Sequence, residues 1–150
     1  MEFKMAMELL AQRTGAEGGY PADDDGVVMM HVDDILHLAL KEIPSDRSVV
    51  MWCHLHEVPE GGAERLFRTL LRENNFGRTT VAGTLSLTED DRICFHTFIP
   101  LDGIDFDGFL VRFERFVESA LNWIDILDAY RPTEETVASP LFGDVNFTKV

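Results

Sequence analysis

The segment SVVMWCHLH, residues 48–56, decides the fold. β-Branched and aromatic side chains dominate it, and such residues favour a pleated strand whose successive side chains point to opposite faces. One face carries Val49, Met51, Cys53 and Leu55, and the other carries Val50, Trp52, His54 and His56. The first face predicts a strand packed beneath helices. The second is apolar or amphipathic and predicts a surface for a partner, although burial of both faces in the core is the alternative.

Two short strands are expected before this segment. Residues 27–32 and 35–40 are rich in apolar side chains, and Asp33-Asp34 between them predicts a turn. Further upstream, residues 2–14 have apolar side chains at helical spacing, and Gly15 is a plausible helix end. The Gly-, Pro- and Asp-rich residues 15–26 predict a loop.

The clearest helix follows the segment, after Pro59 and Gly61-Gly62, and ends at Asn74-Asn75. Its apolar residues match the i, i+3, i+4, i+7, i+8 spacing of an amphipathic helix. They are Ala63, Leu66, Phe67, Leu70 and Leu71. This stripe predicts packing either in the core of the domain or against a second copy.

The C-terminal half continues with two strands, 80–87 and 92–99, around an acidic turn that predicts a hairpin. Asp105 is a good N-cap for a long helix over 106–129, whose wide apolar arc predicts burial against a sheet. Short strands joined by tight turns predict an α+β fold, a twisted antiparallel sheet packed by helices. We expect residues 1–130 to form one domain and residues 131–150 a loosely held C-terminal tail.

Charge narrows the classes of function. The 150 residues include 27 acidic and 13 basic ones, a formal net charge of −14. We expect no nucleic-acid partner, since phosphate binding needs clustered Lys and Arg. No apolar run approaches the roughly 20 residues that span a bilayer, so no membrane insertion is expected. Cys53 and Cys94 lie in apolar runs and are expected to be reduced, buried thiols of a cytoplasmic protein.

Catalytic motifs are absent from the sequence: no G-x-S-x-G, P-loop or G-x-G-x-x-G occurs. We therefore expect no enzyme and no cofactor. The alternative is a small metal-dependent enzyme in which His54 and His56, two residues apart in a strand, hold one ion. A third ligand would come from His31, His37 or His96. Because no zinc-ligand spacing occurs elsewhere, no metal site is expected.

The order helix–β–β–β–helix–β–β–helix resembles the class I type III secretion chaperones, the CesT-like (Tir chaperone) family. In that family two leucines and a later asparagine close the second helix, and a hairpin with alternating leucines ends in Pro-Leu. Similar residues are Leu70-Leu71 with Asn74 here, then Gly83-Thr84-Leu85-Ser86-Leu87, and Ile93 through Pro100-Leu101. The resemblance covers roughly residues 1–130.

The resemblance implies a cytoplasmic bacterial chaperone, a homodimer, that keeps secreted virulence effectors soluble and ready for export. It implies binding of the N-terminal segment of an effector in extended form, and the export ATPase of the apparatus as a further partner. An alternative within the same fold is a regulatory binder that titrates another secretion regulator.

The resemblance also assigns residues by position. Effector binding falls on the first helix and the sheet, through Phe3, Met7, Leu10, Val50 and Trp52. The dimer contact falls on the second helix, through Ala63, Leu66, Phe67, Leu70 and Leu71.

Overall fold

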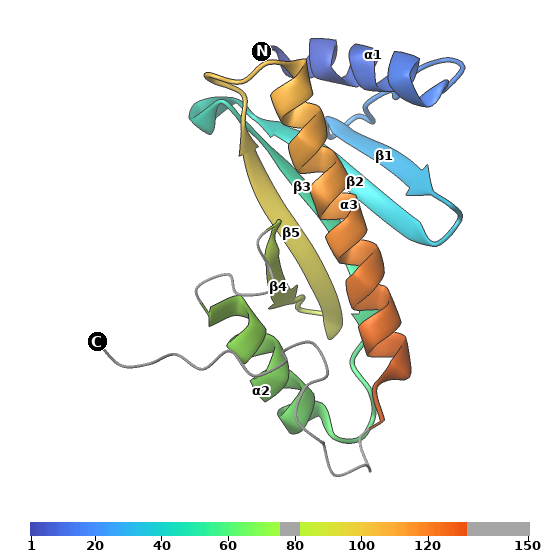
Figure 1. The fold of residues 1–150 in the computed structure, drawn as a ribbon, viewed down its shortest axis with the longest axis vertical. Coiled ribbons are helices and arrows are strands. Elements are labelled where there is room, and N and C mark those ends of the chain that lie inside the picture. The colour runs from blue at the N-terminus through green and yellow to red at the C-terminus, as the bar shows by residue number, and fades with distance from the viewer. Residues whose placement is uncertain (76–81, 132–150) are drawn as a thin grey trace.

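The central segment of the sequence forms the middle strand of a five-stranded sheet in the computed structural model, which describes residues 1–75 and 82–131 (Figure 1). The elements in chain order are α1 (Phe3–Thr14), β1 (Val27–Val32), β2 (Leu36–Ile43), β3 (Ser48–Glu57), α2 (Ala63–Asn74), β4 (Thr84–Leu87), β5 (Arg92–Pro100) and α3 (Phe106–Ala129). This order confirms the predicted α+β class.

All neighbouring strands are antiparallel, in the order β1-β2-β3-β5-β4. The second strand is longer than the predicted 35–40, because β2 stays paired with β3 as far as Ile43 opposite Ser48. A strand was predicted over residues 80–87, and β4 begins at Thr84. The first two residues of the predicted strand, Thr80 and Val81, lie outside the described residues.

Gly83 explains how β4 approaches β5. A Cβ atom on this residue would lie 2.7 Å from the carbonyl oxygen of His96 and 2.8 Å from the ring of Phe95. Real Cβ atoms do not approach backbone so closely, so only glycine lets the chain enter β4 at this point.

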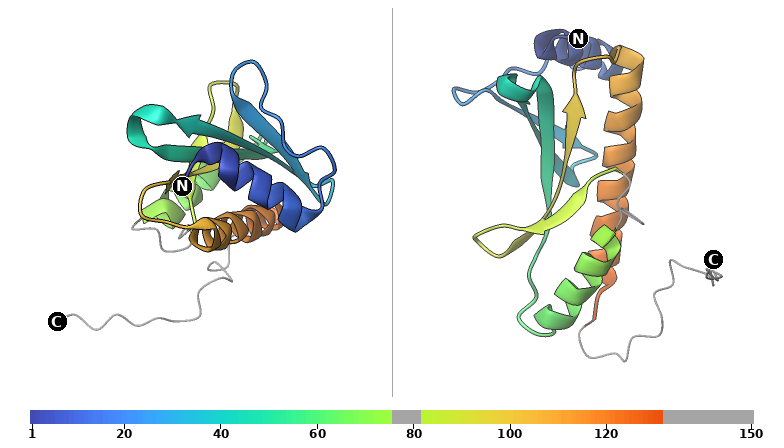
Figure 2. Two further views of the ribbon diagram at one scale, coloured as in Figure 1. Left: turned by 90° about the horizontal axis from the view of Figure 1, so that it is seen from above. Right: turned by 90° about the vertical axis from the view of Figure 1, so that its left-hand side faces the viewer.

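Helices α1 and α3 cover one face of the sheet, and the hydrophobic core lies between (Figure 2). The predicted inner residues of β3 are buried there, and the Phe95 ring of β5 stacks on Phe116 of α3 with centroids 4.9 Å apart. Truncating a buried aromatic of this kind to alanine costs about 3–5 kcal/mol. The inner face of the sheet is therefore fully used in stabilising the monomer.

The opposite face of the sheet is open. None of the described α-helices lies over it, and the right-hand view of Figure 2 shows the sheet bare on the side away from α3. Val50 and Trp52 of β3 are half-buried on this face and His54 is exposed. The prediction of one core face and one accessible face is confirmed for residues 49–54. It is wrong for His56, because a β-bulge after His54 turns the His56 side chain to the side of the sheet that α3 covers, where it contacts Asp128.

Capping residues define the start of α3 and the end of α1. Asp105 accepts a hydrogen bond from the backbone N–H of Gly108 and starts α3, as its position predicted. Gly15 ends α1 in the left-handed conformation, with φ of 71°. Within residues 1–75 and 82–131, no helix combines the length and the hydropathy that crossing a membrane requires.

Candidate binding grooves

A groove of about 390 Å³ lies between α1 and the loop that leads into β1; we call it the α1–β1 groove. Its walls are mostly apolar, with Lys4 and Glu8 of α1 among the lining residues. The remaining lining residues are Phe3, Met7, Gly18, Gly19, Tyr20, Pro21, Ala22 and Val28.

Local hydrogen bonds hold the loop against β1. Ala22 forms a β-bridge with Val28, and the Asp23 carboxylate accepts the backbone N–H groups of Asp25 and Val27 at 3.0 and 2.8 Å. At the other side, the Tyr20 hydroxyl lies 2.8 Å from that of Thr14 on α1. The loop therefore forms a fixed outer wall of the groove.

The five predicted effector-binding residues do not lie in one groove. Phe3 and Met7 line the α1–β1 groove, whereas Leu10 is 1% exposed and belongs to the core. Val50 and Trp52 lie on the open face of the sheet, on the other side from α1. The structure thus separates an α1 group from a sheet group, and their role in binding stays a prediction.

A second groove, of about 260 Å³, lies between α2 and β4; we call it the α2–β4 groove. It is almost entirely apolar, and two of its leucines are conspicuously exposed, Leu71 at 69% and Leu87 at 47%. The lining residues are Phe67, Leu70, Leu71, Asn74, Leu85, Ser86, Leu87 and Ile93.

The predicted dimer-contact residues divide around this groove. Phe67, Leu70 and Leu71 line it, but Leu66 turns inward and lies in the core, buried to 3% exposure. Ala63, in the first turn of α2, is half-buried. The apolar stripe of α2 therefore has two roles. Leu66 anchors the helix in the core, and Phe67, Leu70 and Leu71 line the groove.

Asn74 fixes the geometry of the α2–β4 groove. Its side-chain amide donates to the carbonyl oxygen of Leu85 at 2.7 Å and its side-chain oxygen accepts the N–H of the same residue at 2.9 Å. The side chain thus pairs with β4 much as a strand would. This contact gives a physical reason for the asparagine in the motif that closes the second helix.

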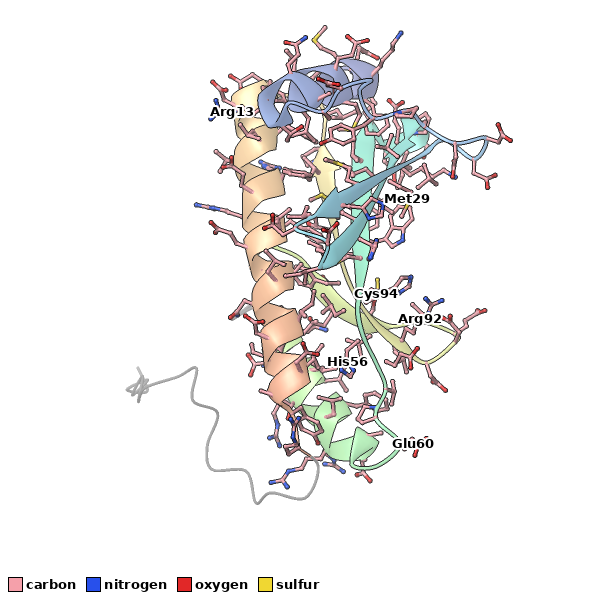
Figure 3. The ribbon with its side chains drawn as sticks, turned by 90° about the vertical axis from the view of Figure 1, so that its right-hand side faces the viewer. Arg13, Met29, His56, Glu60, Arg92 and Cys94 are labelled. Carbon is pink, nitrogen blue, oxygen red and sulfur yellow. The ribbon has the colours of Figure 1, made fainter. Side chains whose placement is uncertain are left out.

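The open face of the sheet carries a further set of side chains. Met29 and Phe98 are exposed, and Figure 3 shows Met29 on the side of the sheet away from α3. The His31 and His37 rings pack edge to face across β1 and β2, with centroids 4.6 Å apart. His96 is partly buried here, which lowers the pKa of its imidazole.

The two histidines of the enzyme alternative have different surroundings. A β-bulge separates His54 from His56 in the pairing of β3 with β5. The His56 ring contacts the carbonyl oxygen of Glu57 at 2.6 Å and the Asp128 carboxylate at 3.4 Å, beside the C-terminal end of α3 (Figure 3). Among residues 1–75 and 82–131, no three His, Cys, Asp or Glu side chains are grouped to hold a metal ion.

The thiols are unsuited to nucleophilic chemistry. Burial raises the pKa of Cys53 to about 12, and the neighbouring Cys94 adds to the effect. Burial also raises the pKa of Cys94. Because the thiolate is the reactive form, a raised pKa makes both thiols less reactive than an exposed cysteine.

Sequence reasoning missed several residues of these surfaces. Tyr20 and Ala22 come from a loop without periodicity, so no pattern placed them beside α1. Leu85 and Leu87 were recognised only as part of a motif. Their alternation in TLSL is the signal that could have placed them on one side of β4.

No curated protein sequence is significantly similar to this chain. Solved structures share its fold at low sequence identity. The ExsC–ExsE complex has a TM-score of 0.69 at 16% identity, over 82% of this chain and 91% of the other. The HopA1–SchA chaperone–effector complex has a TM-score of 0.68 at 15% identity, over 82% and 93%.

A third similar structure is the Yersinia pestis type III secretion chaperone SycH in complex with a fragment of YscM2. It has a TM-score of 0.63 at 16% identity, over 81% of this chain and 99% of the other. The sequence profile of the Tir chaperone protein (CesT) family matches residues 6–124, most of the chain. The chain therefore belongs to the Tir chaperone protein (CesT) family.

Proposed function

We propose that this chain works as a homodimer in the bacterial cytoplasm, where it holds the N-terminal segment of an effector extended for delivery to the export ATPase. Its family and fold are those of type III secretion chaperones that bind effectors. The observation that carries the finer proposal is the presence of two separate apolar grooves, one at α1 and one at α2.

The α2–β4 groove supports the dimer. Leu71 and Leu87 are exposed to water, which is unfavourable for apolar side chains. Burying apolar surface in a contact stabilises the complex by about 25 cal/mol per Å². A second copy would present the same stripe, and a two-fold contact of this kind is self-complementary. Phe67 and Leu71 are then the residues that we expect to meet their counterparts.

The α1–β1 groove supports binding of a client. It is open and apolar, with charged side chains of α1 beside it, as expected for a surface that alternates between water and a peptide. An extended segment suits this shape better than a folded domain, because a chain can follow a narrow groove. The net charge of −14 then keeps the complex dissolved.

Co-purification tests the proposal. The tagged chain is expressed in its native host, and captured proteins are identified by mass spectrometry and mapped by limited proteolysis. We expect a secreted protein, protected only over an N-terminal segment and bound to two copies of the chain. Capture of a secretion regulator would support the regulatory alternative, and a single copy bound to a folded domain would contradict the proposal.

A further inference from the structure

The open face of the sheet carries three rows of outward side chains that run across the strands. The middle row takes one residue from each strand: Met29, Ala39, Trp52, His96 and Thr84. The row on one side contains Val27, Lys41, Val50 and Phe98, and the row on the other contains His31, His37, His54, Cys94 and Ser86. None of these residues is acidic, although the chain has 27 acidic residues. This face therefore differs in charge from the rest of the protein.

Apolar and aromatic side chains on this face are accessible to water. Met29 is 50% exposed and Phe98 is 57% exposed, and the indole of Trp52 is half-buried. The rings of His96 and Phe98 pack edge to face with centroids 6.0 Å apart. Exposed aromatic and long apolar side chains that lie together mark a contact surface. A cover for this face needs apolar side chains and tolerates negative charge.

The C-terminal residues of the chain have such a composition. Residues 132–150 lie outside the described residues and beyond the match to the family profile, so family membership assigns them no role. Val145 and Phe147 alternate with polar residues, which is the period of an extended segment with one apolar side. Leu141 and Phe142 come shortly before them and add to the apolar content.

This segment starts close enough to reach the open face. The His56 ring lies 3.4 Å from the Asp128 carboxylate, so the end of α3 is beside the end of β3. Trp52 is four residues away along β3, a distance of about 13 Å. Leu141 is ten residues beyond Arg131, a reach of roughly 33 Å. The chain after α3 can therefore pass around the end of the sheet and return over the other face.

Charge and distance favour the open face over the client groove. Glu134, Glu135 and Asp144 outnumber Lys149, so residues 132–150 have a net charge of −2. The open face offers Lys41 and no carboxylate in its three rows. The α1–β1 groove lies at the other end of the 24-residue α3, roughly 36 Å away and beyond the reach calculated above (Figure 1).

We propose that residues 139–150 fold back onto the open face of the sheet and pack Phe142 and Phe147 on the surface around Trp52. Residues 132–138 would form the connection from α3. The contact is made within one chain, so it goes beyond the client and dimer contacts of the proposed function.

A second positive site offers the tail another position. Arg112 and Arg115 of α3 line a cavity of about 230 Å³ beside Thr97 and Ile99, on the side of the sheet that α3 covers. Guanidinium groups bind carboxylates well, so they could attract Asp144. A tail held there would leave the open face uncovered. The accessibility of the open face therefore separates the two positions.

Quenching of tryptophan fluorescence by acrylamide tests the contact in the full-length chain. Trp123 is buried in the core, so the accessible signal comes from Trp52. The Phe142→Asp/Phe147→Asp variant should release the segment from the sheet. Its quenching constant should rise roughly twofold, and its emission should shift to longer wavelength, because the indole ring loses its apolar cover.

The matched control places the same charges in the connection. Thr133→Asp/Thr136→Asp should change neither the quenching nor the emission, since both residues precede the packed segment. Equal quenching of the native chain and the Phe142→Asp/Phe147→Asp variant would overturn the inference. Increased quenching in the control as well would also overturn it, because charge anywhere in the tail would then have the same effect.

Zero-length cross-linking locates the tail, because the chain has three lysines in different places. Lys4 lines the α1–β1 groove, Lys41 lies on the open face, and Lys149 belongs to the tail itself. Mass spectrometry should find Asp144 linked to Lys41, and Lys41→Arg should abolish this product. Links to Lys4 would place the tail in the client groove and overturn the inference. Links that join isotopically labelled to unlabelled copies would overturn it too, since the cover would then come from a second copy.

A consequence for the client rests on the proposed function. Val50 and Trp52, the predicted sheet residues for effector binding, belong to the face that the tail would cover. The Phe142→Asp/Phe147→Asp variant should then capture the client more tightly, because the native chain must first release its tail. Equal capture would contradict this consequence, while quenching and cross-linking decide the contact itself. If neither protein captures a client, the proposed function fails and the contact is still decided by those two measurements.

Discussion

The two ends of the molecule carry grooves of similar size but different character. At one end, the α1–β1 groove has charged side chains of α1 beside it and a glycine-containing loop as its outer wall. At the other, the α2–β4 groove is built from leucines, Phe67 and Ile93, with Asn74 and Ser86 as its polar lining residues. A surface that is exposed to water between binding events tolerates the first composition, whereas the second is the composition expected of the dimer contact that we propose.

This difference shows that apolar residues in one helical stripe can have different roles, some packing in the core and others lining a surface groove. On α2, Leu66 is held in the core while Leu71, five residues later, is almost as exposed as a surface polar residue. On α1, Phe3 and Met7 support the core and also form the floor of a groove. Assembly and client binding can therefore be disrupted separately, and the predictions below do so in order of decreasing effect.

The largest effect is expected for Leu71→Asp, which places a charge in the α2–β4 groove. Burial of an unpaired carboxylate in the contact would cost several kcal/mol, enough to separate the two copies. Light scattering should show the mass fall from twice 17.0 kDa to a single chain. Thr69→Asp adds the same charge outside the groove and should leave the dimer intact. A dimeric Leu71→Asp protein would place the contact elsewhere.

A smaller effect is expected at the other end for Ala22→Glu. Ala22 is exposed at the wall of the α1–β1 groove, so a longer charged side chain there obstructs the groove without disturbing the core. Client capture should weaken about tenfold while the mass of the dimer stays unchanged. Ala16→Glu, in the same loop but not among the lining residues, provides the comparison. If Ala22→Glu and Ala16→Glu weaken client capture equally, the α1–β1 groove is not the binding site.

Asn74→Ala tests the wall of the α2–β4 groove. The substitution removes two hydrogen bonds and leaves the partly buried N–H and C=O of Leu85 without them, at a cost of about 1–3 kcal/mol. Urea unfolding should show this decrease in the free energy of unfolding. The dimer should also be weaker, so that it dissociates at protein concentrations at which the native chain is still dimeric. Asn75→Ala should be near neutral, because the Asn75 side chain is exposed and forms neither of the two hydrogen bonds to Leu85.

The smallest effect is expected for Asp105→Ala at the α1 end of α3. Loss of the N-cap hydrogen bond to Gly108 should cost about 1 kcal/mol of unfolding free energy and leave dimerisation unchanged. Asp105→Ser should restore most of the stability, since serine is also a good N-cap. Equal stability of the alanine and serine variants would show that the cap contributes nothing.

Much of the fold could be predicted because its signals are local. The bounds of α3 follow from Asp105 and a regular apolar arc, whose residues Phe116 and Trp123 are buried. The alternation in 48–56 identified the two faces of β3 as far as His54, but not the β-bulge that turns His56 toward α3. What covers each face depends on contacts between distant residues, so the open face became visible only in the structure.

The grooves were harder to predict. The stripe on α2 identified Leu66 and Leu71 together, because helical spacing cannot tell a core contact from a surface one. Val50 and Trp52 were grouped with Phe3 by resemblance, yet α1 lies across the other face of the sheet. Arg112 and Arg115 are ordinary surface residues in the sequence, and their position beside Thr97, Phe98 and Ile99 comes from the way α3 crosses β5.

Hydrogen exchange of the captured client in complex with the full-length chain tests the central claim most directly. An extended segment held in grooves predicts slow exchange over one contiguous N-terminal stretch of the client and fast exchange in the residues that follow. The α1 and β1 amides of the chain should slow in the same complex. Protection spread over a whole folded domain of the client, or none at its N-terminus, would contradict the account.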